Sequence, residues 1–189
     1  MIERLEKIDQ ELFLYLNSIH SEFMDQFMWF VSGKIEWIPL YLVLIYFIIK
    51  NYKKLSWIIF IGIALSILLA DQFSVKLFKE VFERYRPCHN FDIGSMVHIV
   101  NQKCGGKFGF VSSHAANSFA TAVFVGTFLK PYYRLVLPLL IIWATLVSYS
   151  RIYLGVHYPS DVIGGAVLGS LLALIVARFV NNWLKIYQK

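Results

Sequence analysis

The sequence predicts an all-α fold: a polytopic transmembrane helical bundle of about five or six spans, preceded by helices in the membrane interface. Composition is the first reason, because 58% of the 189 residues are hydrophobic and only 16% are charged, whereas soluble domains carry roughly 25% charged residues. The mean hydropathy of +0.58 agrees. The second reason is that apolar residues gather in runs close to the ~20 residues that a helix needs to cross the hydrocarbon core. We expect a single membrane-embedded domain over residues 1–189.

Segment 8–33 precedes the long apolar runs and is predicted to form one or two amphipathic helices in the interface. Apolar residues recur at helical spacing from Leu12 to Ile19, and Glu22 and Asp25 then interrupt the apolar character. The alternative is a sixth, poor membrane span. The residues before this segment mix both charges without an apolar core, so no cleaved signal peptide is expected.

Five apolar runs follow, and each is predicted to be a helix that crosses the membrane. The second run continues past its apolar part as a polar but helix-compatible stretch, without Pro or Gly before Pro87. Gly164, Gly165 and Gly169 in the last run allow close helix packing. The predicted spans are residues 36–50, 55–86, 112–129, 135–150 and 159–183, and residues 87–111 are predicted to form an outer loop.

The short connections predict the orientation of the bundle. The turns 50–54 and 130–134 and the tail 178–189 hold Lys and Arg but no Asp or Glu, and five spans put all three on one side. Positive charge favours the cytoplasmic side. The opposite side then carries the loop 87–111 and the turn 149–159, so we expect the chemistry at the outer face. The net charge of +6 follows this distribution and does not indicate a nucleic-acid partner.

The outer loop also holds Cys88 and Cys104, the two cysteines of the chain. In an oxidising compartment they are expected to form a disulfide that braces the loop. The alternative is a pair of free thiols, because spacing alone does not establish the geometry.

Lys79 and Arg86 form the first of three polar clusters at the predicted outer face. Seven positions separate them, so on one continuous helix they would share a face about 10 Å apart. Two cations at the end of a membrane helix predict an anion site, although such residues also commonly extend towards lipid head groups.

Ser112, Ser113 and His114 form the second cluster, at the start of the third predicted span. Serine is a common N-cap, and the free N–H groups of a first helical turn bind phosphate well. His114 is placed to transfer a proton there.

Arg151, His157 and Asp161 form the third cluster, around the start of the last span. Pro159 suits a first helical turn, so Asp161 can reach back to one nitrogen of His157 and leave the other nitrogen free to attack. Each cluster alone has a structural explanation. Their predicted meeting at one end of one bundle favours a functional site, because ionisable groups near the membrane are costly.

The three clusters resemble the three-part signature of the type 2 phosphatidic acid phosphatase (PAP2) family. That family includes lipid phosphatases and is related in fold to vanadium haloperoxidases. The first and third parts match completely. In the second part the family usually has Pro-Ser-Gly-His, so the backbone path into the helix is expected to differ here. The corresponding segments are Lys79-x6-Arg86-Pro87, Val111-Ser112-Ser113-His114 and Ser150-Arg151-x5-His157-x3-Asp161, and in the second of them only Ser112 and His114 match.

The resemblance implies a role for each matched residue. His157 is expected to be the nucleophile that forms a phosphohistidine, with Asp161 orienting it and His114 acting as the general acid. The phosphate-binding residues are expected to be Lys79, Arg86, Ser112, Ser113 and Arg151. Because phosphoryl transfer needs mostly positioning and charge stabilisation, these cations can act without Mg²⁺. We expect no metal and no other cofactor.

The resemblance implies a lipid phosphate substrate. We expect a bacterial cytoplasmic (inner) membrane location, with the active site facing the periplasm or exterior as the basic turns indicate. Undecaprenyl diphosphate is the first-choice substrate. Phosphatidylglycerol phosphate, phosphatidic acid and lipid A are alternatives, as is transfer of the phosphoryl group to another lipid. A non-enzymatic anion or lipid transporter is the alternative from another class, and the membrane spans argue against a vanadate-dependent peroxidase. The expected setting is phospholipid metabolism or the cell envelope.

Overall fold

The computed structural model describes residues 2–187, and within them the ordered structure is helical, without a β-strand. The all-α prediction is therefore confirmed. The π-helix Ser74–Lys79 joins α4 to α5, and short 3-10 turns occupy the connections. The α-helices are α1 (Ile2–Ser18), α2 (Glu22–Ser32), α3 (Ile38–Tyr52), α4 (Ser56–Phe73), α5 (Glu80–Phe82), α6 (Ser113–Leu129), α7 (Val136–Tyr153) and α8 (Pro159–Tyr187).

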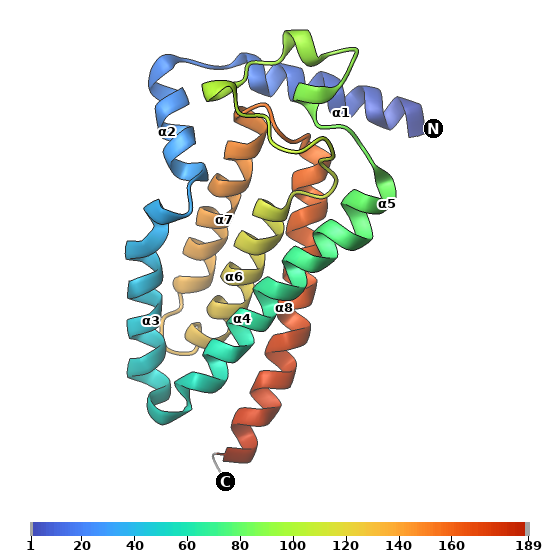
Figure 1. The fold of residues 1–189 in the computed structure, drawn as a ribbon. Helices are drawn as coiled ribbons and strands as arrows, with labels where there is room; N and C mark the ends of the chain where they lie inside the picture. The colour runs from blue at the N-terminus through green and yellow to red at the C-terminus, as the bar shows by residue number, and fades with distance from the viewer. Residues whose placement is uncertain (1, 188–189) are drawn as a thin grey trace.

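Helices α3, α4, α6, α7 and α8 run along one bundle, and α1 lies across one end of it (Figure 1). That end also carries the segment 83–112 and the turn between α7 and α8, and it is called the loop end below. The opposite end carries the α3–α4 turn, the α6–α7 turn and the end of α8, so the basic connections lie together. Helix α6 packs most extensively against α8 and α7.

Three helical segments of the described chain are long and apolar enough to cross a membrane: Ile35–Phe82, Val136–Tyr153 and Pro159–Tyr187. The first folds back at Lys53–Leu55, so it holds both α3 and α4 (Figure 1). Helix α6 has 17 residues and lies among the others. The count of five or six spans stays a prediction.

Apolar side chains occupy both the inside and the outside of the bundle. Phe124, Ile58 and Leu129 are buried in the main core. Many large apolar residues of α3, α4, α7 and α8 instead point outwards and are exposed. Exposed apolar surface of this extent is unfavourable in water and suits a hydrocarbon solvent.

Small residues set the spacing between α6 and α8. A Cβ added at Gly165 would collide with the carbonyl oxygen of Ser112, and one at Gly169 would collide with the backbone of Ala116. The predicted use of these glycines for close packing is confirmed, and it fixes the start of α6 against the start of α8.

The second predicted span ends earlier than the sequence suggests. Glu83 adopts a left-handed conformation with φ of +44°, so α5 stops at Phe82 and the predicted helix to residue 86 is wrong. Beyond it the chain is extended: Arg86 N donates to Lys107 O at 2.9 Å, and Gly109 N donates to Arg84 O at 2.8 Å. Pairing with the outer loop therefore replaces the last helical turn, and Lys79 and Arg86 do not share a helix face.

Segment 8–33 forms two helices, α1 and α2, where the sequence predicts one or two, and α1 begins earlier, at Ile2. Their location in the membrane interface stays a prediction. One side of α1 is buried against the loop end. Phe13 is fully buried there, and Asn17 Nδ2 donates to the carbonyl oxygens of Tyr153 at 2.8 Å and of His98 at 3.0 Å. These contacts hold α1 across the end of the bundle.

Candidate active site

A pocket of about 380 Å³ opens at the loop end, and it is called the anion pocket below. Segments far apart in the sequence contribute to it, and no carboxylate occurs among its lining residues within the described chain. Four cations, Lys79, Arg86, Lys103 and Arg151, line it together with His114 and His157. This charge distribution suits a phosphate group.

His157 lies between α7 and α8 and is almost fully buried, with 1% of its surface exposed. Its Nδ1 lies 3.3 Å from Asp161 Oδ2, and its Nε2 lies 3.2 Å from Arg86 Nη1. Arginine only donates hydrogen bonds, so Nε2 accepts and Nδ1 carries the proton that is donated to Asp161. The lone pair of Nε2 therefore faces the cationic side of the pocket.

Burial lowers the pKa of His157 well below its ordinary value, and the positive charges of Arg86, Arg151 and Lys79 add to the effect. The imidazole is therefore neutral near pH 7. Only the neutral form has a free lone pair, so His157 is in the protonation state that a nucleophile requires.

Arg86 and Arg151 approach the pocket from different segments. Arg86 Nη1 also lies 3.3 Å from Val156 O, and Arg151 Nη1 donates to the hydroxyl of Ser32. The Nε atoms of both arginines are buried and have no acceptor among the described residues. Buried donors without partners cost free energy, so both side chains are suited to bind an anion.

Lys79 is the last residue of the π-helix, a distortion that occurs often at functional sites. Its Nζ donates to Ser113 Oγ at 2.6 Å, and Ser113 Oγ lies 2.7 Å from Ser74 Oγ. These bonds hold the ammonium group at the start of α6. Lys79 and Ser113 thus line the pocket together.

Ser112 and Ser113 have different positions. Ser112 is fully buried and is the N-cap of α6, where its Oγ accepts from Ala115 N at 3.4 Å. Its side chain is not among those lining the anion pocket, so the expectation that it binds phosphate is not supported by its placement. Ser113 and His114 do line it.

Gly109 packs directly against the His157–Asp161 pair. A Cβ there would lie 3.1 Å from Asp161 Oδ2, 3.5 Å from His157 Nδ1 and 3.2 Å from Arg86 Cγ. The absence of a side chain at this position therefore allows the outer loop to close over the pair.

Arg84, Asp9 and Ser160 were not predicted. Arg84 Nη1 donates to Asp161 Oδ1 at 3.0 Å and to Ser160 Oγ at 2.7 Å, and Arg84 Nη2 donates to Asp9 Oδ2 at 2.8 Å. Arg84 lies inside the unspecified part of the first motif. A second arginine two residues before Arg86 is a weak signal, and nothing in the sequence pairs it with Asp9.

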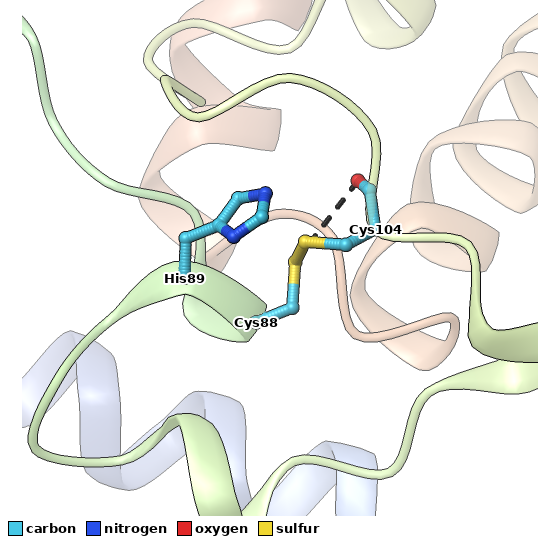
Figure 2. A group of neighbouring side chains, drawn as sticks. All are labelled: Cys88, His89 and Cys104. Atoms are coloured by element: carbon cyan, nitrogen blue, oxygen red, sulfur yellow. Dashed lines mark hydrogen bonds between the residues drawn. A yellow bond between two sulfur atoms is a disulfide. The ribbon is translucent and has the colours of Figure 1, made fainter.

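The outer loop is braced by a disulfide between Cys88 and Cys104, and His89 lies beside it (Figure 2). The three side chains come close enough to resemble a metal site. A disulfide sulfur is not a thiolate, however, and metal binding to Cys requires the thiolate. Cys104 itself lines the anion pocket, so the bridge fixes part of the pocket wall.

A larger cavity of about 670 Å³ lies deeper between α3, α4, α6 and α7, and it is called the apolar cavity below. Its walls are mostly apolar, with Leu44 and Phe60 among them. Ser113 and His114 line both this cavity and the anion pocket. The two spaces therefore meet at the first turn of α6.

Comparison with known proteins points to one family. The model of the PAP2 superfamily matches residues 55–185. A lipid A 4'-phosphatase of Bacteroides thetaiotaomicron is 40% identical over 89% of this chain and 75% of its own length. A lipid A 4'-phosphatase of Porphyromonas gingivalis is 35% identical, over 95% of this chain and 74% of its own length. An undecaprenyl-diphosphatase of Sulfolobus acidocaldarius is 31% identical, over 91% of this chain and 78% of its own length.

The fold has a solved counterpart as well. A crystal structure of a transmembrane PAP2-type phosphatidylglycerolphosphate phosphatase from Bacillus subtilis superimposes with a TM-score of 0.72 and 24% identity. The similarity covers 95% of this chain and 87% of that one. At this identity the similarity shows the fold alone.

Proposed function

The chain belongs to the PAP2 superfamily and is a lipid phosphatase, and from that premise we propose that it removes a phosphate from the sugar headgroup of lipid A at the 4' position. The observation that carries the proposal is the 40% identity to a lipid A 4'-phosphatase over 89% of this chain. The first-choice substrate from the sequence, undecaprenyl diphosphate, has weaker support, because the relative with that activity is 31% identical.

The proposed reaction begins with His157. The lone pair of Nε2 attacks phosphorus, the bond from phosphorus to the sugar oxygen breaks, and a phosphohistidine forms. His114 donates a proton to the departing oxygen, which leaves as a hydroxyl group. Water then attacks the phosphohistidine, His114 takes the proton of that water, and inorganic phosphate leaves while His157 is restored.

The surrounding charges support this sequence of steps. Lys79, Arg86 and Arg151 are placed to neutralise the charge on the transferring oxygens, and preorganised charge is usually the largest contribution to such catalysis. The Asp161 carboxylate accepts a hydrogen bond from Nδ1–H and balances the positive charge that His157 gains on attack. A metal ion has no part in this proposal.

The two adjoining spaces support an amphiphilic substrate. The anion pocket would take the phosphate, and the apolar cavity beyond Ser113 would take hydrocarbon chain. Trp29 lines the anion pocket, and Lys103 Nζ lies 5.5 Å from the centre of its ring. An aromatic face beside a cation at the rim suits a phosphorylated sugar better than a small glycerol headgroup.

Orientation and location are part of the proposal. The basic connections lie at the end of the bundle opposite the loop end (Figure 1), and the anion pocket opens at the loop end. The tendency of positive residues to stay in the cytoplasm supports an inner-membrane enzyme whose pocket faces the periplasm or exterior.

The test is a panel of purified substrates in detergent micelles with EDTA present: bis-phosphorylated lipid A, undecaprenyl diphosphate, phosphatidylglycerol phosphate and phosphatidic acid. We expect the fastest phosphate release from lipid A, with mass spectrometry locating the loss at the 4' position, and no release with His157→Ala. Faster phosphate release from another lipid would show that the proposed substrate is wrong. Recovery of radiolabelled phosphate on an added lipid acceptor would show phosphotransfer in place of hydrolysis.

A further inference from the structure

Asp161 is a carboxylate that is fully buried and bonded on both oxygens. Oδ2 lies 3.3 Å from His157 Nδ1 and accepts from Tyr158 N at 3.0 Å, while Oδ1 accepts from Arg84 Nη1 at 3.0 Å. A buried carboxylate without a partner of opposite charge is costly. Among the described residues Arg84 is the cation in direct contact with it. Arg84 on Oδ1 and the Tyr158 N–H on Oδ2 together fix the direction in which the carboxylate faces His157.

Arg84 is held in turn by two further contacts. Its Nη2 donates to Asp9 Oδ2 at 2.8 Å, and its guanidinium carbon lies 4.1 Å from the centre of the Tyr158 ring. Burial opposes the charged form, but the carboxylates of Asp161 and Asp9 outweigh it and raise the pKa of Arg84 above its ordinary value. The planar guanidinium is suited to bridge two carboxylates in a fixed geometry.

Asp9 connects this bridge to α1. Its Oδ1 accepts from the backbone N–H of Ser160 at 3.0 Å, and its Oδ2 also accepts from the Ser160 hydroxyl. Ser160 lies in the first turn of α8, where N–H groups lack helical partners and a negative charge is favourable. The Phe13 ring packs against Tyr158 with 5.4 Å between centroids, which fixes α1 beside the same turn.

We propose that Arg84 and Asp9 are positioning residues of the phosphatase, and that α1 takes part in catalysis by holding them. The chain of contacts runs from Asp9 in α1 through Arg84 to Asp161 and ends at His157. The inference rests on the proposed roles of His157 and Asp161. It assigns a function to an N-terminal helix that lies outside the matched region 55–185.

A purely structural ion pair would affect stability and leave the turnover of folded enzyme unchanged. A positioning role predicts a loss in kcat, because a misdirected Asp161 leaves the imidazole misaligned, with little change in KM, because neither Arg84 nor Asp9 lines the anion pocket. We expect Arg84→Gln to lower kcat about 10- to 100-fold, by analogy with the loss on removing a partner that orients a histidine ligand at a metal site.

The experiment compares full-length variants in detergent, with bis-phosphorylated lipid A as substrate and activity corrected for folded protein. Arg84→Lys should recover part of the lost kcat, since lysine restores the charge but does not bridge both carboxylates. Asp9→Asn should lower kcat by less than Arg84→Gln. Adding Asp9→Asn to Arg84→Gln should cause no further loss, because the two residues act in one chain.

The matched controls are Arg4→Gln and Glu11→Gln, which change the same charges at exposed positions of α1 and should leave kcat unchanged. A kcat within twofold of the wild type for folded Arg84→Gln, or for folded Asp9→Asn if the arginine variant does not fold, overturns the inference. If the wild type released no phosphate from this substrate, or if His157→Ala still released it, the proposed function would be wrong instead.

Discussion

At the scale of single residues, the charge state of His157 carries the mechanism and can be tested through stability. Its pKa in the folded protein lies below its ordinary value because the ring is buried among cations. The unfolded chain therefore binds more protons near pH 6, so stability rises with pH there. Stability should be lost as pH falls below about 6.5, the ordinary value.

We expect acidification from pH 7.5 to 5.5 to lower the unfolding temperature of the wild type more than that of His157→Gln. The difference should correspond to about 1.4 kcal/mol at pH 5.5. Thermal unfolding in detergent at both pH values measures it. His89→Gln is the matched control, because His89 is only partly buried in the outer loop and should behave like the wild type. Equal shifts for wild type and His157→Gln would contradict a neutral, buried His157.

Residue types at fixed spacing predicted most of the pocket. The anion pocket is lined by five of the predicted residues, because each motif carries its side chains on a short local segment. They are Lys79, Arg86, His114, Arg151 and His157. The choice between Ser112 and Ser113 was not predictable, since the helix register decides which hydroxyl faces inwards. The partners of Asp161 were missed because Asp9 and Arg84 meet it only through the tertiary packing of α1.

At the scale of helices, the interface between α6 and α8 is the most constrained contact near the site. Gly165 and Gly169 bring α8 against the backbone of Ser112 and Ala116. The start of α6 carries Ser113 and His114, so a shift of this interface would displace both from His157.

Gly169→Ala should destabilise the protein by about 1–3 kcal/mol, the usual cost of inserting a group into a packed interior. The added methyl group would collide with the backbone of Ala116, and a backbone atom within α6 cannot shift without displacing the helix. A fall in unfolding temperature by several degrees measures the effect. Gly106→Ala is the control, because nothing lies within 4 Å of its added Cβ. Equal unfolding temperatures of Gly169→Ala and Gly106→Ala would mean that α6 and α8 can move apart at little cost in free energy.

Helix positions were predictable to within a few residues, because long apolar runs separated by short basic turns leave few alternatives. The end of the second helix was not. Glu83 takes a left-handed conformation that favours glycine, and it precedes residues that pair with the outer loop, a contact that the sequence does not reveal. The π-helix Ser74–Lys79 was not predictable either, because the spacing of the apolar residues does not distinguish it from an α-helix.

At the scale of the whole molecule, the apolar cavity and the anion pocket meet at Ser113 and His114. Ile45, which lines the cavity, is 41% exposed. The cavity is therefore open to the surroundings of the bundle, which we expect to be lipid. Composition predicted a membrane protein, but it could not predict a cavity, because a lining residue and a core residue have the same chemistry.

Thr121→Phe should fill part of the apolar cavity, which Thr121 lines, and should raise KM for a long-chain lipid phosphate. Hydrolysis of p-nitrophenyl phosphate, which has no hydrocarbon chain, should be unchanged. Thr127→Phe makes the same change at an exposed position of the same helix and serves as the control. Equal effects of Thr121→Phe on both substrates would show that the cavity does not hold the chain.

The junction of the two spaces at the first turn of α6 has a consequence for turnover. In the proposed reaction the two products separate into different phases: inorganic phosphate dissolves in the aqueous compartment, while the dephosphorylated lipid diffuses sideways within the leaflet. Each exit can be occupied without closing the other, so the next amphiphile can arrive from the bilayer before the phosphate has departed.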